Sequence, residues 1–380
     1  MPDEVRKLIY EMQYNFVILH PKNLSQKMKD NNAHTLERLG SLIEDSSCIS
    51  IVTHMKPDGD AMGSSAAMCH FLGMCGKKDV RIVLPDRYPA NLDFIAGSLP
   101  EGSILIHEEH AEAAEARIAG SDLVICLDFN AFHRTDRLEE SLKASGAAKV
   151  LIDHHLNPDR TPFTVSFSET EISSASELLY HILMAMPQTG SDARRLPAAT
   201  ATALMTGMTT DTNNFANSTY PSTLRMASAL LEAGVDRDAI LYSLYNRHSE
   251  NRLRLMGHMM KDLLRITPDG VAYIVLDRKT QLEYHMEEGD TEGFVNMPLS
   301  IEAVKMSLLL KEDGERVRVS IRSKRGISAN MCSKLHFNGG GHENAAGGRL
   351  YIPGDIRDIT QAASYIERHT HIFMTEENEK

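Results

Sequence analysis

The sequence predicts an α/β fold made of two domains: a largely parallel sheet with helices on both faces, followed by a smaller α+β domain. Short runs rich in Val, Ile and Leu alternate with helical stretches up to about residue 230, which is the pattern of a parallel sheet covered on both sides. The order of elements then changes, because a strand is followed by a segment that reads as a hairpin. At 380 residues, the chain also exceeds the size of one ordinary core.

The first domain is predicted from segments that alternate regularly. A helix over 36–45 leads into a strand over 48–54, and a second helix covers 61–75. Further strands are expected at 80–84, 103–106, 122–128 and 149–153, and further helices at about 174–186, 197–208 and 221–233. Because strands separated by helices pair in parallel, their carboxyl ends should meet along one edge of the sheet.

The second domain follows a more polar stretch that we interpret as a linker. Its expected elements are a strand over 271–277, a hairpin over 303–323 that turns at Asp313 and Gly314, a helix near 327–336, a glycine-rich loop, a strand over 349–352 and a final helix. The predicted division is an N-terminal extension at 1–35, a first domain at 36–234, a linker at 235–252 and a second domain at 253–375.

The composition is that of an acidic globular protein. Hydrophobic residues make up 42% of the chain, charged residues 24%, and the formal net charge is −12. Proteins that bind long duplex nucleic acid need clustered Lys and Arg to release counterions, so this charge favours a small anionic substrate bound through cations. No apolar run is long enough for a membrane span, the first residues lack a secretory signal, and the five cysteines form no CxxC pair. These features predict a cytoplasmic protein with reduced thiols.

Metal-binding side chains end three of the predicted strands. His54, Asp128 and Asp153 each end one strand, and His154 and His155 follow Asp153 directly. Open α/β sheets bind ligands beyond the carboxyl ends of their strands. By itself, Asp128 is explained as a loop cap and the histidine pair as surface residues. Their common position at one edge instead favours a single site.

Two further acidic segments complete the candidate metal site. Asp58 and Asp60 follow His54 and flank Gly59, which allows a tight turn that directs both carboxylates to one centre. Asp211 follows a helical stretch. An isolated Asp-Gly pair such as Asp58-Gly59 is more often a turn beside an N-cap aspartate, and Asp211 alone would be unremarkable. Several buried carboxylates, however, repel each other unless cations neutralise them. Oxygen and imidazole ligands without thiolates favour Mn²⁺, with Mg²⁺, Co²⁺ and Fe²⁺ as alternatives.

These segments resemble the motifs of the DHH phosphoesterase superfamily: a His followed by DxD, a strand-end Asp, Asp-His-His and a later Asp. The resemblance rests on HMKPDGDAMGSS at 54–65 and LIDHH at 151–155. GGGHENAAGG at 339–348 is similar to the signature of the DHHA1 domain, so the match spans roughly residues 36–375. The length and the two-domain plan look most like the NrnA-type oligoribonucleases and pAp phosphatases, which are also labelled exopolyphosphatase-related.

The resemblance implies a role for each residue of the metal site. The ligands of one metal ion would be His54, Asp58 and Asp128. The ligands of a second ion would be Asp60, Asp128, His154 and Asp211, so that Asp128 bridges the two. Asp153 would orient a histidine. His155 would face the substrate phosphate and stabilise charge in the transition state.

The second domain is predicted to bind the substrate. Consecutive glycines permit close approach of an anion to backbone N–H groups, although such a segment is also common as a flexible loop. The candidate contacts are Arg322, Ser323, Asn330, Gly339, Gly340, Gly341 and His342 in this domain, and Arg134 in the first domain. A metal site on one domain and an anion-binding loop on the other predict a cleft that admits only short substrates.

The predicted function is hydrolysis of small phosphate esters. We expect short oligoribonucleotides and linear dinucleotides to be cleaved to mononucleotides, and pAp to be converted to AMP, by water that two divalent ions activate. An exopolyphosphatase or a cyclic-dinucleotide phosphodiesterase would use the same ligands. A non-catalytic nucleotide-binding regulator is the alternative from a different class. Neither long duplex nucleic acid nor a membrane is an expected partner, and the sequence is compatible with a homodimer.

Overall fold

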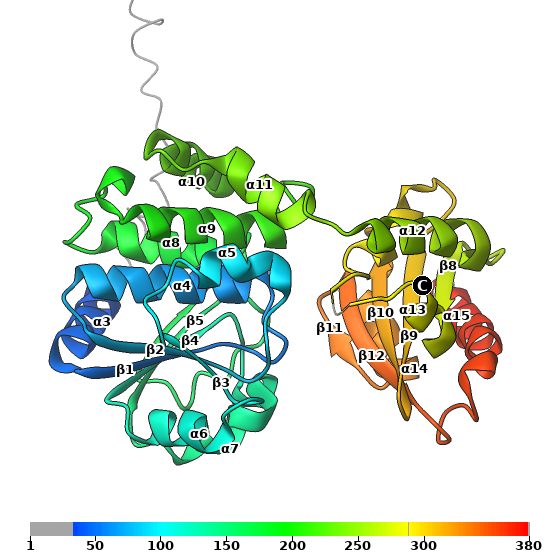
Figure 1. Ribbon diagram of the computed structural model, residues 1–380, viewed down its shortest axis with the longest axis horizontal. Coiled ribbons are helices and arrows are strands. Elements are labelled where there is room, and N and C mark those ends of the chain that lie inside the picture. The colour runs from blue at the N-terminus through cyan, green and yellow to red at the C-terminus, as the bar shows by residue number, and fades with distance from the viewer. Residues whose placement is uncertain (1–32, 288, 379–380) are drawn as a thin grey trace, which may run out of the picture. The chain divides into compact units, whose positions relative to one another are not determined.

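The computed structural model describes residues 33–287 and 289–378. These residues form two compact units that divide between Leu244 and Tyr245, and each has its own sheet (Figure 1). The predicted α/β fold class, a parallel sheet followed by a second sheet domain, is confirmed. Most of the predicted extension lies outside the described residues; its last three residues, 33–35, form the first turn of α3 (Ala33–Asp45).

The first unit is built on a six-stranded parallel sheet with the order β3-β2-β1-β4-β5-β6. The chain adds β2 and β3 on one side of β1, and β4, β5 and β6 on the other. Ligands of such sheets bind where the order reverses, which here is between β1 and β4. The strands are β1 (Cys48–Val52), β2 (Asp79–Leu84), β3 (Ile104–Ile106), β4 (Leu123–Leu127), β5 (Ala148–Asp153) and β6 (Val165–Ser168).

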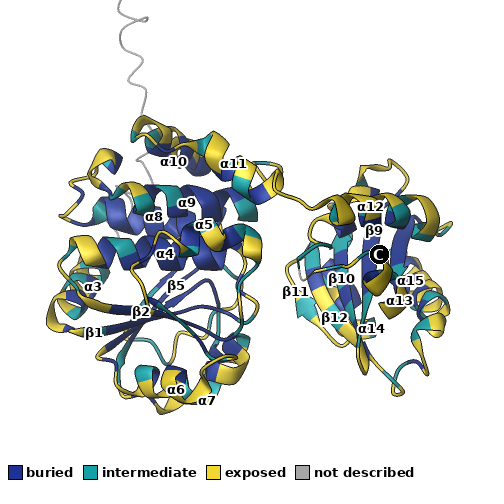
Figure 2. Ribbon diagram, viewed as in Figure 1, coloured by how far each residue is buried: buried dark blue, intermediate teal, exposed yellow. Residues whose placement is uncertain are grey.

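Helices cover both faces of this sheet (Figures 1 and 2). On one face, α4 (Gly59–Met74) packs against α8 (Ala175–Ala185) and α9 (Ala198–Asp211), and 13 of its 16 residues are buried. A helix that is apolar on nearly every side is typical of such an enclosed position. The opposite face packs against α6 (Ala111–Ala119) and α7 (Glu139–Ala144). The remaining helices are α5 (Asp93–Ala96), α10 (Pro221–Glu232) and α11 (Arg237–Tyr245).

Two glycines allow α4 and α9 to approach each other closely. A Cβ at Gly59 would lie 2.4 Å from the Thr210 side chain, and one at Gly63 would lie 2.7 Å from the Ala203 carbonyl oxygen. The expectation that Gly59 serves a tight turn is therefore corrected: it is the first residue of α4, its φ is not left-handed, and the neighbouring helix excludes a side chain there. This close contact brings the first turn of α4 next to the last turn of α9.

The second unit contains a six-stranded mixed sheet with the order β11-β12-β10-β9-β8-β7. Its strands are β7 (Arg265–Ile266), β8 (Val271–Leu276), β9 (Met306–Asp313), β10 (Arg316–Ser323), β11 (Gly340–Gly341) and β12 (Ala345–Tyr351). β9 and β10 form an antiparallel pair, and Gly314 has φ 63° between them. One face packs against α14 (Ala329–His336) and α15 (Ala362–Asn378), and the other against α12 (Glu250–His258) and the 3₁₀ segment Phe294–Ser300.

The predicted linker at 235–252 is largely helical, because α11 and α12 occupy most of it. The two units divide between Leu244 and Tyr245; the domain limits drawn from the sequence stay predictions. Within 33–287 and 289–378, no helix combines the length and the apolar character that a membrane span requires.

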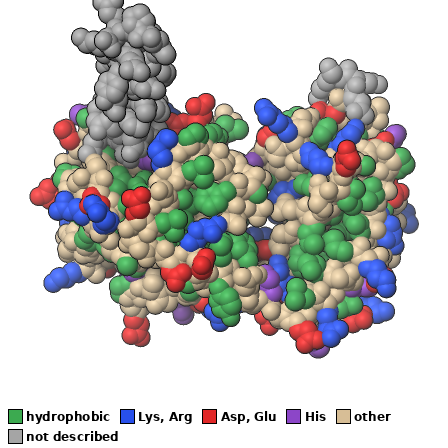
Figure 3. Space-filling model, turned by 90° about the horizontal axis from the view of Figure 1, so that it is seen from above, with side chains coloured by type: hydrophobic (Ala, Val, Ile, Leu, Met, Phe, Trp, Pro, Cys, Tyr) green, Lys and Arg blue, Asp and Glu red, His purple; other side chains and the backbone are tan. Residues whose placement is uncertain are grey.

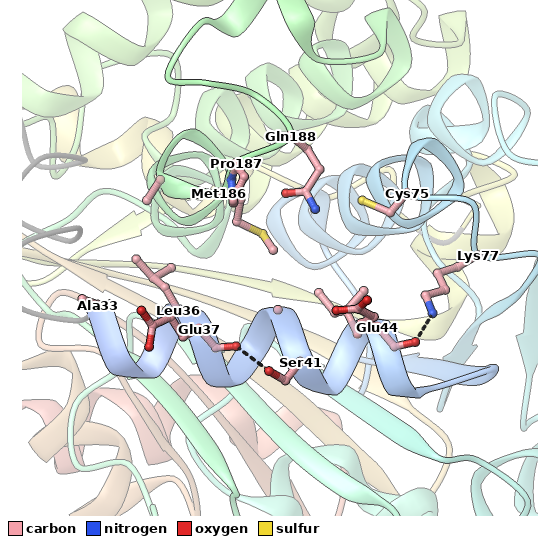
Figure 4. Close-up of a pocket in the computed structure, with 13 residues that line it drawn as sticks. Ala33, Leu36, Glu37, Ser41, Glu44, Cys75, Lys77, Met186, Pro187 and Gln188 are labelled. Atoms are coloured by element: carbon pink, nitrogen blue, oxygen red, sulfur yellow. Dashed lines mark hydrogen bonds between the residues drawn. The ribbon is translucent and has the colours of Figure 1, made fainter.

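An open hollow of about 700 Å³ lies beside α3 (Figure 4). Leu36, Met186 and Pro187 line it, together with Cys75, which follows the last residue of α4. Since a helix of 16 residues is about 24 Å long, this hollow lies far from the first turn of α4. It is therefore separate from the candidate metal site.

Candidate metal centre

The predicted metal ligands of the first unit meet at the carboxyl edge of its sheet. His54 follows β1 by two residues, Asp128 follows β4 directly, and His154 follows β5 directly. Asp60 lies in the first turn of α4, and Asp211 is the last residue of α9. The close contact between α4 and α9 therefore adds two carboxylates to the three strand-end residues.

Asp128 lies at the centre of this group. Its Oδ2 is 3.4 Å from His54 Nε2, and its Oδ1 is 3.4 Å from His154 Nε2. Asp58 Oδ1 lies 3.9 Å from the same His54 atom. These distances are longer than that of a good hydrogen bond. They are close to the separation of about 3.0 to 3.4 Å that is expected between two ligand atoms when each lies about 2.1 Å from the same ion. Asp128 thus has the position of a carboxylate shared between two ligand groups.

His154 joins the second ligand group. Its Nε2 lies 3.5 Å from Asp211 Oδ2 and 4.0 Å from Asp60 Oδ2. Ligand atoms of these three residues lie within 4.8 Å of one another, and the same holds for His54, Asp58 and Asp128 and for Asp128, His154 and His155. Carboxylate oxygens and imidazole nitrogens without thiolates are a donor set that suits Mn²⁺ and related divalent ions.

The immediate surroundings of Asp128 fit bound cations. Asp128 is 2% exposed, and its Oδ1 accepts no hydrogen bond. Its φ of 65° is a left-handed value that non-glycine residues adopt rarely and mostly at functional sites. A buried carboxylate oxygen without a donor is unfavourable, and a cation would remove that cost. His54 Nδ1 donates to the Met55 carbonyl at 2.8 Å, which leaves Nε2 to act as a metal ligand.

Without metal, the histidines carry the positive charge of the site. Burial opposes protonation of His54, but the adjacent Asp128 carboxylate, together with Asp58, raises its pKa to about 9. The pKa of His154 rises to about 10 against burial, because Asp128, Asp211 and Asp60 surround it. Burial, followed by the neighbouring carboxylates, raises the pKa of Asp60 well above its ordinary value, and burial raises that of Asp211 to about 7. Asp60 and Asp211 are crowded enough to hold protons that metal ions would displace. Although burial opposes it, the histidines around Asp128 lower the pKa of that carboxyl.

Asp153 is bonded to His155 rather than to His154. Its Oδ1 lies 2.7 Å from His155 Nδ1, and the Asp153 side chain is fully buried. A buried carboxylate at Nδ1 fixes the orientation and tautomer of an imidazole. The chain itself therefore sets the ring direction of His155.

Asp58 caps the start of α4, whereas Asp60 binds backbone N–H groups at the start of α8. Asp58 is the N-cap of α4, and its Oδ1 accepts hydrogen bonds from Asp60 N at 3.0 Å and Ala61 N at 3.1 Å. Asp60 is bonded elsewhere: its Oδ2 accepts from Ala175 N at 2.6 Å and its Oδ1 from Ser176 N at 2.9 Å. These N–H groups start α8, where the helix dipole favours a negative charge. These two hydrogen bonds to Asp60 were not predicted from the sequence.

In the second unit, most glycines of the predicted anion loop serve packing. A Cβ at Gly339 would lie 1.9 Å from the Gly347 carbonyl oxygen, and one at Gly341 would lie 2.6 Å from that of Ala345. His342 closes the tight turn between β11 and β12, because its N–H donates to Ala345 O at 2.8 Å. The glycines here let two strands meet closely.

Gly340 is the member of this loop that borders polar side chains. A Cβ at Gly340 would make only ordinary contacts, 3.6 Å from Lys334 Cε and 3.8 Å from Asn330 Oδ1. The Asn330 oxygen is buried and accepts no hydrogen bond. Lys334, one turn further along α14, was not selected from the sequence, where it resembles an ordinary surface lysine. Arg322 Nη1 donates to the Ile321 carbonyl at 2.9 Å.

Ser323 and Arg134, two other predicted substrate contacts, lie in different surroundings. The Ser323 hydroxyl donates to Ile327 O at 2.6 Å and accepts from Asn344 Nδ2 at 3.0 Å, so it holds the loop after β10. Arg134 lies beside the metal edge, because its carbonyl oxygen accepts from Met55 N at 2.8 Å. The Nε of Arg134 is buried and has no hydrogen-bond partner, and a bound anion would supply the missing acceptor.

Surface charge is mixed on the face shown in Figure 3, where Lys and Arg side chains are interspersed with Asp and Glu. The net charge of the chain is −12. The face shown therefore does not supply the clustered cations that binding of a long duplex needs.

Comparisons with known proteins identify relatives for both units. The DHH family, N-terminal domain, matches residues 48–208, and the DHHA1 domain matches residues 269–367. The chain is 31% identical over 314 residues to the bifunctional oligoribonuclease and PAP phosphatase NrnA of Thermus thermophilus, covering 80% of this chain and 84% of that one. It is 25% identical over 300 residues to the Bacillus subtilis protein of the same name, covering 78% and 88%.

A solved structure extends the likeness to the fold. An exopolyphosphatase-related protein from Bacteroides fragilis is 34% identical, with a TM-score of 0.83 over 91% of this chain and 98% of that one. The predicted membership is thereby confirmed. The chain belongs to the DHH family of metal-dependent phosphoesterases and carries a C-terminal DHHA1 domain.

Proposed function

We propose that this phosphoesterase cleaves short oligoribonucleotides and linear dinucleotides to mononucleotides and removes one phosphate from pAp to give AMP. The observation that carries the proposal is the pair of ligand groups that share Asp128, with its Oδ2 3.4 Å from His54 Nε2 and its Oδ1 3.4 Å from His154 Nε2. The substrates are those in the names of the Thermus and Bacillus relatives. They are short and carry more than one phosphate.

The ligand groups would hold two divalent ions, and the donor set favours Mn²⁺. His54, Asp58 and Asp128 would bind one ion, and Asp60, Asp128, His154 and Asp211 the other. When bound, the ions supply Lewis acidity, which makes water a nucleophile near neutral pH and neutralises phosphoryl oxygens.

Two side chains of the protein would bind and orient the phosphate of the substrate. Asp153 holds His155 through Nδ1, and in its doubly protonated form His155 would donate from Nε2 to a phosphoryl oxygen whose negative charge grows during the reaction. Arg134 has a buried Nε without a partner, and its guanidinium would pair with the same phosphate. Both groups position the phosphorus for in-line attack by water.

The second unit would bind another phosphate of the same substrate. The side of Gly340 where a Cβ would lie is free of close contacts, and Lys334 and Asn330 border it, so a phosphate would lie there next to the Lys334 ammonium. Arg322 and His342 would add cationic or neutral donors at the glycine-rich turn. In this proposal residues 36–234 perform the chemistry and residues 253–375 select substrates.

Initial rates of the full chain with Mn²⁺ on pApA, pGpG, pAp, cyclic di-AMP and polyphosphate test the proposal. We expect the linear dinucleotides and pAp to be hydrolysed fastest. Intact pApA, pGpG and pAp would contradict the substrate assignment. Faster release of phosphate from polyphosphate would favour an exopolyphosphatase, and faster opening of cyclic di-AMP a cyclic-dinucleotide phosphodiesterase. Mn²⁺ binding without any turnover would instead favour a nucleotide-binding regulator.

A further inference from the structure

Glu177 is a buried carboxylate that the proposed reaction does not use. It lies in the first turn of α8, and none of its surface is exposed. A buried charge is unfavourable unless several hydrogen bonds compensate it. The contacts of Glu177 therefore indicate what the charge holds in place.

Glu177 connects three segments of the first unit. Its Oε2 accepts hydrogen bonds from Ser173 N at 3.1 Å, from Ser173 Oγ, and from Thr223 Oγ1 at 2.6 Å in α10. Its Oε1 lies 3.5 Å from His181 Nε2, one turn further along α8. Although burial raises it, these hydrogen-bond donors lower the pKa of Glu177 to about 2, so the carboxylate is ionised at neutral pH.

The result is a closed turn at the start of α8. Ser174 is the N-cap, and its Oγ accepts from Glu177 N at 2.9 Å. Glu177 in turn accepts the N–H of Ser173. Glu177 is thus hydrogen-bonded to both Ser174 and Ser173, in the manner of a capping box displaced by one residue.

The two N–H groups inside this turn are those that hold Asp60. Ala175 N and Ser176 N donate to the two Asp60 oxygens at 2.6 and 2.9 Å. Space around Asp60 is also closed by α9, because a Cβ at Gly207 would lie 2.8 Å from Asp60 Oδ1. The direction of the Asp60 carboxylate therefore depends on the conformation that Glu177 fixes.

We propose that Glu177 is a positioning residue for the ion site that contains Asp60, His154 and Asp211. The proposal rests on the metal assignment of the proposed function and concerns one of the two ligand groups. None of the hydrogen bonds described for the turn at 173–177 reaches His54 or Asp58. Loss of Glu177 should therefore weaken one ion site and leave the other nearly unchanged.

The test is a Mn²⁺ titration of the full chain by calorimetry, with electron paramagnetic resonance of free and bound Mn²⁺. We expect wild type to bind two ions. Glu177→Ala should weaken one of them about tenfold, which is the lower end for a residue that supports a ligand. Glu177→Gln, which keeps an acceptor for Ser173 and Thr223, should weaken it less.

Thr189→Ala is the matched control. Thr189 is fully buried at the other end of α8, where its hydroxyl donates to Leu183 O at 2.8 Å and Met186 O at 3.1 Å. We expect it to lower the unfolding temperature while both Mn²⁺ affinities stay as in wild type. If Glu177→Ala does not fold, Thr223→Val removes one donor to Glu177 and should weaken the same ion by a smaller factor.

Two results would overturn the proposal: unchanged Mn²⁺ affinities in the Glu177 variants, or equal weakening of both ions. The outcome is separable from failure of the proposed function. Wild type that binds two ions but leaves pApA, pGpG and pAp intact overturns the substrate assignment and leaves the role of Glu177 standing. Wild type that binds no Mn²⁺ overturns both.

Discussion

The metal-ligand edge of the first unit and the glycine-rich turn of the second unit satisfy their polar groups in opposite ways. At the edge, Asp128 is buried with an oxygen that accepts no hydrogen bond, and its backbone has φ 65°. In the turn, His342 N donates to Ala345 O at 2.8 Å, and Ser333 Oγ donates to Gly347 O at 2.6 Å. At the edge, the chain leaves a buried carboxylate oxygen without a hydrogen bond, whereas in the turn these polar groups are hydrogen-bonded to one another.

This difference separates two kinds of functional region. The edge concentrates ionisable groups whose mutual repulsion bound metal ions would relieve, so its order and its chemistry should both depend on metal. The turn uses neutral backbone groups and steric fit, so its shape should be independent of any ligand.

Asp128→Asn should have the largest effect, because Asp128 belongs to both ligand groups. We expect kcat/KM for pApA to fall more than about 100-fold, beyond the loss typical of a residue that merely supports a ligand, and Mn²⁺ binding to weaken at both sites. Asp122→Asn is the control: Asp122 precedes the same strand and accepts hydrogen bonds from Ser47 N and Cys48 N. Equal losses in the two variants would show that the effect is on the strand and not on the site.

Saturation with Mn²⁺ should stabilise the first unit more than the second. At a concentration of 100 times Kd, binding contributes about 2.7 kcal/mol to the free energy of unfolding. Amide hydrogen exchange should slow at residues 54–60, 128 and 154–155, with little change at 339–348. Equal protection of both segments would contradict the view that only the edge is completed by metal.

The edge was largely predictable from sequence for a physical reason. His54, Asp128 and Asp153 each follow an apolar strand-like run, and the rule for parallel sheets places such positions together. The strand VSFS at 165–168 was missed, because only two of its four residues are buried and so short an alternation resembles a loop.

The supporting contacts were beyond sequence reasoning, because they depend on tertiary approach. The N–H groups of Ala175 and Ser176 bind Asp60, yet a backbone donor leaves no mark in the sequence. Glu177 looks like an ordinary capping glutamate until Thr223 is placed against it. Gly59 was recognised, but the reason for it, the nearness of Thr210, could not be seen before α4 and α9 were packed.

Within the turn, neighbouring glycines should respond differently to alanine. Gly339→Ala would place a methyl group 1.9 Å from Gly347 O, and overpacking of this kind costs about 1–3 kcal/mol. Gly340→Ala meets only ordinary contacts and should change the free energy of unfolding by less than about 0.5 kcal/mol. It should instead raise KM for pAp about tenfold, because the added methyl group would displace the phosphate from Lys334, and one hydrogen bond to a charged group is worth about that factor. Urea unfolding and steady-state kinetics of both variants measure this, and a destabilised Gly340→Ala would contradict it.

Acid should weaken the support beneath the edge and spare the support of the turn. The pKa of Glu177 lies at about 2 in the folded protein, against an ordinary value of 4.5. Because the folded pKa is depressed, its stabilisation is complete above pH 4.5 and is lost by about 1.4 kcal/mol per unit as the pH falls towards 2. Urea unfolding of metal-free protein should therefore show the gap between wild type and Glu177→Gln narrowing from pH 5 to pH 3. Ser333→Ala removes a neutral bond to Gly347 O, and the free energy that it removes should not change over this range. A pH-independent gap for Glu177→Gln would mean that the buried carboxylate is not ionised, and the edge and the turn would then be supported by the same kind of neutral contact.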